Sequence, residues 1–176
     1  MSKTLLLLRH AKSSWDAPAH SDFERPLNRR GERSAAVIGI MMKQEKIVPD
    51  LILCSSARRT LQTRDIIRPY FPRNCPVEET SRIYEASVKE IFSVLSEIPD
   101  NVQKPLLIGH NPGIQELALM LTGEGNRKTW QTMWSKFPTA ALAVLLFDVA
   151  NWREIKARSG NLVDFKSPKM LKRNNT

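Results

Sequence analysis

The segment TLLLLRH, residues 4–10, is an apolar run that ends in a cation and an imidazole. It is too short for a typical helix and has no polar alternation, so it predicts a central strand buried on both faces of a sheet. A second apolar run, PLLIGHN at residues 105–111, ends similarly in His110. Two of the three histidines in the chain therefore follow predicted buried strands.

Other apolar segments predict the rest of the sheet. LILCSS at residues 51–56 predicts a further buried strand, and we expect a short strand near residues 80–84. TAALAVLLFDV and WREIKARSG predict a terminal strand pair over residues 139–149 and 152–160. Residues 11–27 lack periodicity and predict a long loop, and no element is assigned to the polar segment that holds Trp130 and Trp134.

Helical periodicity separates these strands. Apolar residues at helical spacing predict helices over residues 29–45, 57–71 and 87–98, and a fourth from Pro112 through Met120. Asn28, Ser87 and Asn111 precede three of these helices and are suitable N-cap residues. Strands that alternate with helices predict an α/β fold, a three-layer α/β/α sandwich around a mostly parallel central sheet.

Length and composition restrict the class of protein. A chain of 176 residues suits a single domain, which we expect over residues 1–165, followed by a basic C-terminal tail over 166–176. Two cysteines are too few for a disulfide framework and suit a reduced, cytoplasmic setting. The first strand begins near Thr4, which leaves no room for a signal peptide, and no apolar run reaches membrane-spanning length. We therefore expect no membrane partner.

The net charge of +9 suits nucleic acid, an anionic membrane or a phosphorylated ligand. Much of it is scattered over the predicted helices, where arginines commonly face solvent. The sequence has no RNA-binding signature such as an aromatic-bearing strand motif, so we expect no nucleic-acid partner. The charge alone does not choose between the remaining ligands.

Polar residues follow three of the predicted strands. Arg9 and His10 end the first, Ser55 and Ser56 end the second, and His110 ends the third. Ligands of open α/β sheets bind beyond the carboxyl ends of the strands. We therefore expect these side chains to meet at one edge of the sheet and to form a site.

The residue types at this edge suit phosphoryl transfer. A neutral imidazole keeps a lone pair, so His10 can attack phosphorus without a separate base. Arg9 and Arg59 can supply forked donors for the phosphate oxygens. The helix that begins at Pro112 would add backbone N–H groups. His110 beside a bound phosphate would have its pKa raised and could donate a hydrogen bond to it.

Several motifs resemble the histidine phosphatase superfamily, which has a phosphoglycerate mutase-like fold. They are RHA at 9–11, SSARRTLQT at 55–63, YEA at 84–86 and GHNP at 109–112. Four further segments are similar to the SixA-like phosphohistidine phosphatase branch: RHAKSSW at 9–15, RPLNRRG at 25–31, KFPTAA at 136–141 and LVDFKSP at 162–168. The resemblance implies a metal-independent phosphatase without a cofactor, whose partner is a phosphorylated substrate such as a phosphohistidine-bearing phosphotransfer protein.

The resemblance also implies roles for individual residues. His10 matches the nucleophile that becomes transiently phosphorylated. Residues expected to bind the phosphate are Arg9, Arg25, Arg59, His110 and Asn111. Glu85 matches the acid that protonates the leaving group in many members, although a phosphoramidate needs that proton donor less than an ester does. Ala11 replaces the usual small residue, glycine, of the first motif.

Other functions share some of these residues. A phosphatase of the same fold could act on small phosphate esters, and a non-catalytic phosphate-binding protein would use the same arginines. A metal-dependent hydrolase using His10, His110 and Asp16 lacks clustered ligand spacing, and two arginines beside the site would repel a cation. His20, isolated in the polar loop, is expected to face solvent.

Overall fold

The computed structural model describes residues 2–16 and 21–173, so His20 lies outside the described residues. Within this part, one seven-stranded sheet has the strand order β3-β2-β4-β1-β6-β7-β5. Its strands are β1 Ser2–Arg9, β2 Leu51–Ser55, β3 Val77–Thr80, β4 Pro105–Gly109, β5 Thr122–Gly125, β6 Leu142–Asp148 and β7 Gly160–Lys166. β6 pairs antiparallel with both β1 and β7, and the other pairings are parallel, so the predicted mostly parallel sheet is confirmed.

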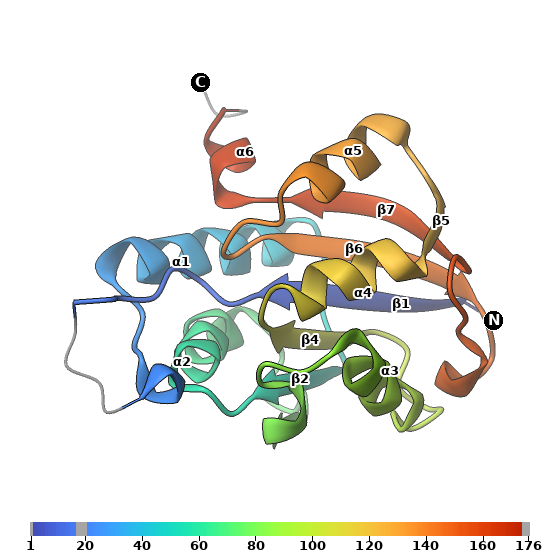
Figure 1. Cartoon of the computed structure of the whole chain (residues 1–176), viewed down its shortest axis with the longest axis horizontal. Coiled ribbons are helices and arrows are strands. Elements are labelled where there is room, and N and C mark those ends of the chain that lie inside the picture. The colour runs from blue at the N-terminus through green and yellow to red at the C-terminus, as the bar shows by residue number, and fades with distance from the viewer. Residues whose placement is uncertain (1, 17–20, 174–176) are drawn as a thin grey trace.

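Helices cover both faces of this sheet (Figure 1). They are α1 Arg29–Gln44, α2 Arg58–Ile67, α3 Val88–Ser96, α4 Gly113–Leu121, α5 Arg127–Ser135 and α6 Pro168–Arg173. Side chains of α3, α4 and α5 form one buried cluster with one face of the sheet, while those of α1 and α2 form a second cluster with the other face. The predicted three-layer sandwich is confirmed.

The four leucines after Thr4 explain why β1 lies in the middle. Leu5 and Leu7 belong to the first cluster, Leu6 and Leu8 belong to the second, and all four are fully buried. Successive side chains of a strand point to opposite faces, so only a strand covered on both sides accommodates an unbroken apolar run.

Several predicted boundaries need correction. Asn28 and Ser87 do cap their helices, Ser87 in a full capping box, but the predicted Asn111 cap is wrong because Pro112 occupies the N-cap position of α4. The short strand lies at Val77–Thr80 rather than near 80–84, where Ser81–Ile83 is a 3₁₀ helix.

The second strand of the terminal pair is also misplaced. Trp152–Glu154 forms a 3₁₀ helix, and the strand is β7. Trp152 and Ile155 are both buried, and their spacing of three residues is that of a 3₁₀ turn rather than of a strand. β5 and α5, which fill the polar segment left unassigned, were not predicted.

The start of the predicted basic tail belongs to the folded body. β7 continues to Lys166, one residue beyond the expected boundary, and Leu171 of α6 packs against the second cluster. The Lys166 ammonium contacts the Glu45 carboxylate at the end of α1. Residues 174–176 lie outside the described part of the chain.

Gly31 fixes the loop that follows β1 against α1. A Cβ atom at this position would lie 2.1 Å from the Lys12 carbonyl oxygen, well inside contact distance. The same carbonyl accepts a hydrogen bond from the Asn28 backbone N–H at 3.0 Å. The glycine of RPLNRRG therefore allows the segment just after His10 to lie directly on the first turn of α1.

Candidate active site

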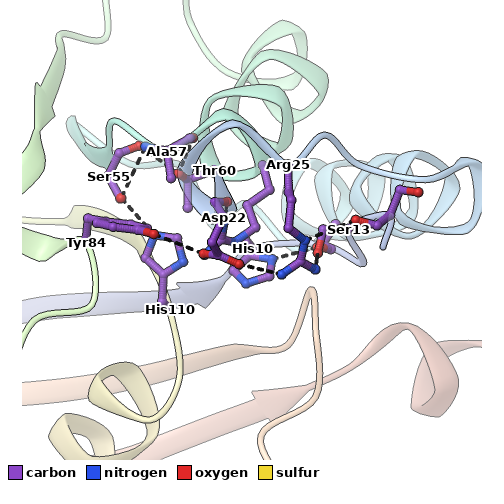
Figure 2. A network of polar contacts seen from close by, with 12 residues as sticks. His10, Ser13, Asp22, Arg25, Ser55, Ala57, Thr60, Tyr84 and His110 are labelled. Atoms are coloured by element: carbon purple, nitrogen blue, oxygen red, sulfur yellow. Dashed lines mark hydrogen bonds and ion pairs between the residues drawn. The ribbon is translucent and has the colours of Figure 1, made fainter. Parts of the chain in front are cut away.

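The carboxyl ends of β1, β2 and β4 meet at one edge of the sheet, as predicted. Arg9 is the register partner of Gly109, and the His10 backbone N–H donates to the Gly109 carbonyl at 3.0 Å. The imidazole rings of His10 and His110 lie with centroids 5.1 Å apart. Figure 2 shows the two rings with Asp22, Arg25 and the strand-end residue Ser55 around them.

The local hydrogen bonding of His10 decides which nitrogen can react. Its Nδ1 lies 2.7 Å from the Ala11 carbonyl oxygen, which only accepts, so Nδ1 carries the proton and Nε2 keeps the lone pair. Burial lowers the pKa of His10 to about 3, although the hydrogen bond to the Ala11 carbonyl by itself would raise it. The positive charges of Arg59, Arg9 and Arg25 lower the pKa further. The ring is therefore neutral at physiological pH.

Arg9 and Arg59 bring two guanidinium groups to these rings. Arg9 donates from Nη1 to the Phe137 carbonyl at 2.8 Å, and its buried Nε has no hydrogen-bond partner within the described part of the chain. Burial, followed by repulsion from Arg59, lowers the pKa of Arg9. Arg59 is buried and donates to the Asp22 backbone carbonyl at 2.7 Å and to its carboxylate at 2.9 Å. These bonds use only two of its five N–H groups.

Arg25 comes from the loop between β1 and α1. Its guanidinium donates to the Ser14 carbonyl at 3.1 Å, to the Ser13 hydroxyl at 2.6 Å and to the Asp22 carboxylate at 2.6 Å. The guanidinium carbon lies 3.3 Å from the centroid of the exposed Trp15 ring, in stacking contact. Arg25 is therefore held at the site rather than extended into solvent.

Asp22, which the sequence analysis did not predict, links Arg25 to Arg59 and Tyr84. Its carboxylate accepts from Arg25, Arg59 and the Tyr84 hydroxyl, the last at 3.0 Å (Figure 2). Desolvation by itself would raise the pKa of Asp22, but the hydrogen bonds from Arg25, Tyr84 and Arg59 more than offset it and lower the pKa. The residue lies in a segment without periodicity, three positions before Arg25, so only the neighbouring RPL motif could have drawn attention to it.

His110 lies between Ser55 and Tyr84. Its Nε2 shares a hydrogen bond of 2.8 Å with the Ser55 hydroxyl, and the Tyr84 ring packs edge-on against the imidazole. The buried Nδ1 has no hydrogen-bond partner among the described residues. Burial, then repulsion from His10 and Arg59, lowers the pKa of His110 to about 3.

The two remaining predicted site residues are placed differently. The Asn111 amide nitrogen donates to the Phe137 carbonyl at 3.1 Å and to the Gln115 side chain at 3.2 Å. The same Phe137 carbonyl also accepts a hydrogen bond from Arg9. Glu85 is exposed, with the left-handed φ of 48°, whereas Tyr84 before it is half-buried against the site. Tyr84 therefore packs against His110, and the role of Glu85 as an acid stays a prediction.

The GlnThr pair after Arg59 fastens α2 to the loop that carries the site. The Thr63 hydroxyl accepts from the Ala11 backbone N–H at 3.0 Å and donates to the Arg59 carbonyl at 2.7 Å. The Gln62 side chain accepts from the Leu27 backbone N–H at 2.7 Å. These bonds position the segment beyond β1 relative to Arg59, so the SSARRTLQT motif supports the loop that follows the RHA motif.

Comparison with known proteins agrees with this geometry. A family model described as histidine phosphatase superfamily (branch 1) matches residues 5–106. The chain belongs to the histidine phosphatase superfamily. It is 35% identical to an uncharacterised protein of Mycobacterium leprae, over 92% of this chain and the full length of that protein.

Solved structures of the superfamily show the same fold. A proposed phosphohistidine phosphatase SixA from Agrobacterium tumefaciens has a TM-score of 0.78 and 31% identity, covering 94% of this chain and 99% of that one. A phosphoglycerate mutase from Plasmodium falciparum has a TM-score of 0.57 and 19% identity, covering 94% of this chain and 89% of that one. The phosphoglycerate mutase-like fold and the SixA-like branch are therefore confirmed, and the comparisons support phosphatase activity.

In the part of the chain that the structure describes, no group of three or more His, Cys, Asp or Glu side chains could hold a metal ion. Asp16, the carboxylate of the metal-dependent alternative, is exposed. Across the same described residues, no helix has the length and hydropathy needed to cross a bilayer.

The neutral histidines predict that acid destabilises this histidine phosphatase. The pKa of both His10 and His110 lies near 3 in the folded protein, below the value of about 6.5 in the unfolded chain. Between these values the unfolded chain binds more protons, so the free energy of unfolding falls as the pH is lowered from 6.5 toward 3. We expect each histidine to cost about 2 kcal/mol at pH 5 relative to pH 8.

Urea unfolding at the two pH values measures this effect. In the variant His110→Gln, the difference in the free energy of unfolding between pH 8 and pH 5 should be smaller by about 2 kcal/mol, the contribution of one histidine. An unchanged pH dependence in that variant would contradict the assignment of His110 as a buried neutral imidazole.

Proposed function

We propose that this protein is a metal-independent phosphatase that forms a covalent phosphohistidine on Nε2 of His10 and acts on protein phosphohistidine. The observation that carries the proposal is the state of His10. Its Nδ1 donates to the Ala11 carbonyl, and its ring is neutral because burial lowers its pKa, which three nearby guanidinium groups lower further. An unprotonated nucleophile beside fixed positive charge is what phosphoryl transfer requires.

The charge of the site suits a phosphoryl group. Arg9, Arg25 and Arg59 contribute three positive charges and Asp22 one negative charge, so the site is net positive by two. A phosphoryl dianion would neutralise this excess. The arginine N–H groups not bonded to protein would stabilise its equatorial oxygens as their charge changes in the transition state. Nδ1 of His110 and Nε of Arg9, which have no hydrogen-bond partner among the described residues, are further polar atoms suited to that ligand.

The reaction follows in two in-line displacements. The Nε2 lone pair of His10 attacks phosphorus while the bond from phosphorus to the leaving group breaks, and the leaving atom takes that electron pair. Water then attacks the phosphorus, the P–Nε2 bond breaks, and Nε2 recovers its lone pair as inorganic phosphate leaves. Loss of a proton from the attacking water to solvent or phosphate completes the balance.

The nature of the leaving group favours phosphohistidine. A phosphate ester leaves as an alkoxide and benefits from a positioned acid, whereas an imidazole nitrogen is a better leaving group. Glu85, the predicted acid, is exposed, and within the described residues no hydrogen bond joins it to the site. The similarity to the SixA structure from Agrobacterium tumefaciens supports the same substrate class. A cytoplasmic location, suggested by the unpaired Cys54 and Cys75, belongs to this proposal.

Trapping the phosphoenzyme tests the proposal. The protein is mixed with a phosphohistidine peptide in EDTA, quenched in alkali to preserve phosphohistidine, and digested for mass spectrometry. We expect phosphate on the peptide that holds His10, and none there in His10→Asn. Turnover that disappears in EDTA, or turnover without label on His10, would contradict the proposal.

A phosphatase for small phosphate esters is the second candidate. The same nucleophile and arginines would serve it, with Glu85 turned inward as the acid. Comparing kcat/KM for phosphohistidine peptides with that for a panel of ester metabolites distinguishes the two. Glu85→Gln should lower kcat/KM for the esters only if this second function is correct.

A further inference from the structure

The Asp22 carboxylate has a chemical role that binding a phosphoryl group does not explain. Among the described residues, the charged groups that act on His10 are the guanidinium groups of Arg9, Arg25 and Arg59, and an anion beside them opposes a phosphoryl dianion. We infer that Asp22 selects the leaving group: it accepts a hydrogen bond from the N–H of a departing imidazole and so favours phosphoryl groups on nitrogen over those on oxygen. This inference rests on the proposed function.

The position of Asp22 suits the leaving side of the reaction. His10 is buried, whereas the Asp22 side chain is 39% exposed, so Asp22 lies nearer to solvent than the nucleophile does. In-line displacement sends the leaving group away from His10 and therefore toward that side. Figure 2 shows the Asp22 carboxylate beside the histidine rings, between Tyr84 and Arg25.

The carboxylate is held so that it can accept but not donate. Arg25, Arg59 and Tyr84 all donate to it, which fixes its orientation and keeps it ionised at neutral pH. It therefore cannot protonate an alkoxide, and its charge repels the negative charge that develops on an ester oxygen. A carboxylate has about four lone-pair positions, so a further donor can still bind there.

An imidazole leaving group offers the complementary donor. When the phosphoryl group is on one ring nitrogen, the other can carry a proton. A carboxylate that accepts from this N–H favours the imidazolium form, as the aspartate of a Ser-His-Asp triad does for its histidine. As the P–N bond breaks, its electron pair returns to the leaving nitrogen, and neutral imidazole departs with the proton still on the other nitrogen. No external acid is consumed in this step.

The isosteric variant Asp22→Asn tests the inference. We compare kcat/KM for a phosphohistidine peptide with that for p-nitrophenyl phosphate, whose leaving group has no N–H. The variant should lose at least about tenfold more activity on the peptide than on the ester, since a charge-assisted hydrogen bond is replaced by a neutral one. Glu24→Gln, an exposed carboxylate on the same 3₁₀ helix Asp22–Glu24, is the matched control and should change neither value.

A second measurement separates this role from simple positioning of the arginines. Without the carboxylate, the leaving imidazolium loses its proton more easily, so kcat/KM for the peptide should fall more steeply between about pH 6 and pH 8 in Asp22→Asn than in the unmodified protein. A second variant, Asp22→Ser, also removes the charge and should show the same selective loss. Thermal unfolding of both variants identifies any loss of activity that is due to misfolding.

The outcomes distinguish the inference from the proposed function. If the unmodified protein fails to hydrolyse the peptide, the proposed function is wrong and this inference is wrong with it. If the unmodified protein is active but Asp22→Asn loses the same factor on both substrates, or gains on the peptide, the proposed function stands and the selective role of Asp22 is overturned.

Discussion

Replacing His10 by alanine should lower kcat by a factor on the order of 10⁵, the loss typical of removing a covalent nucleophile. The variant keeps the guanidinium groups but has no lone pair that can reach phosphorus. The measurement is steady-state turnover of p-nitrophenyl phosphate, with the loss of label from the phosphoenzyme experiment as an independent readout.

Binding supplies the control for this variant. Because Arg9, Arg25 and Arg59 hold their places through contacts that do not involve the His10 ring, His10→Ala should still bind inorganic phosphate or vanadate in calorimetry. Loss of both turnover and binding would indicate a collapsed site. Near-normal turnover would show that a different group attacks the phosphorus, and the mechanism would be wrong.

The part of the site that sequence could predict is the part fixed by the strands. His10 and His110 each follow an unbroken apolar run, and such runs can only be central strands, which places their carboxyl ends side by side. The same reasoning brought Arg59 to the site, because it lies in the first turn of the helix directly after β2. Parallel pairing and short strand-to-helix connections leave these residues little freedom.

The part that sequence could not predict lies in segments without periodicity. Asp22 and Tyr84 reach the site through a 3₁₀ helix and a turn, where side-chain direction depends on tertiary contacts and not on a repeating pattern. Glu85 illustrates the difference, because it is exposed and has a positive φ, while its neighbour Tyr84 packs against His110. The YEA motif located the segment, but not which of its side chains enters the site.

Arg59 should be sensitive even to a change that keeps its charge, although less so than the nucleophile. Arg59→Lys is expected to lower kcat/KM by about 10²- to 10³-fold, the cost of removing a positioned donor from a developing anion. The guanidinium already spans the Asp22 carbonyl and carboxylate and still has N–H groups for the phosphoryl oxygens, whereas a lysine ammonium is a single point charge with three donors.

The neighbouring residue provides a matched control. Arg58 begins the same helix but is exposed, so Arg58→Lys should leave kcat/KM within about twofold of the unmodified protein. If Arg59→Lys retained full activity, the site would need positive charge but not the planar fork of donors. The prediction that the Arg59 guanidinium binds the phosphoryl group through two N–H groups would then be wrong, even though the net charge of the site would be unchanged.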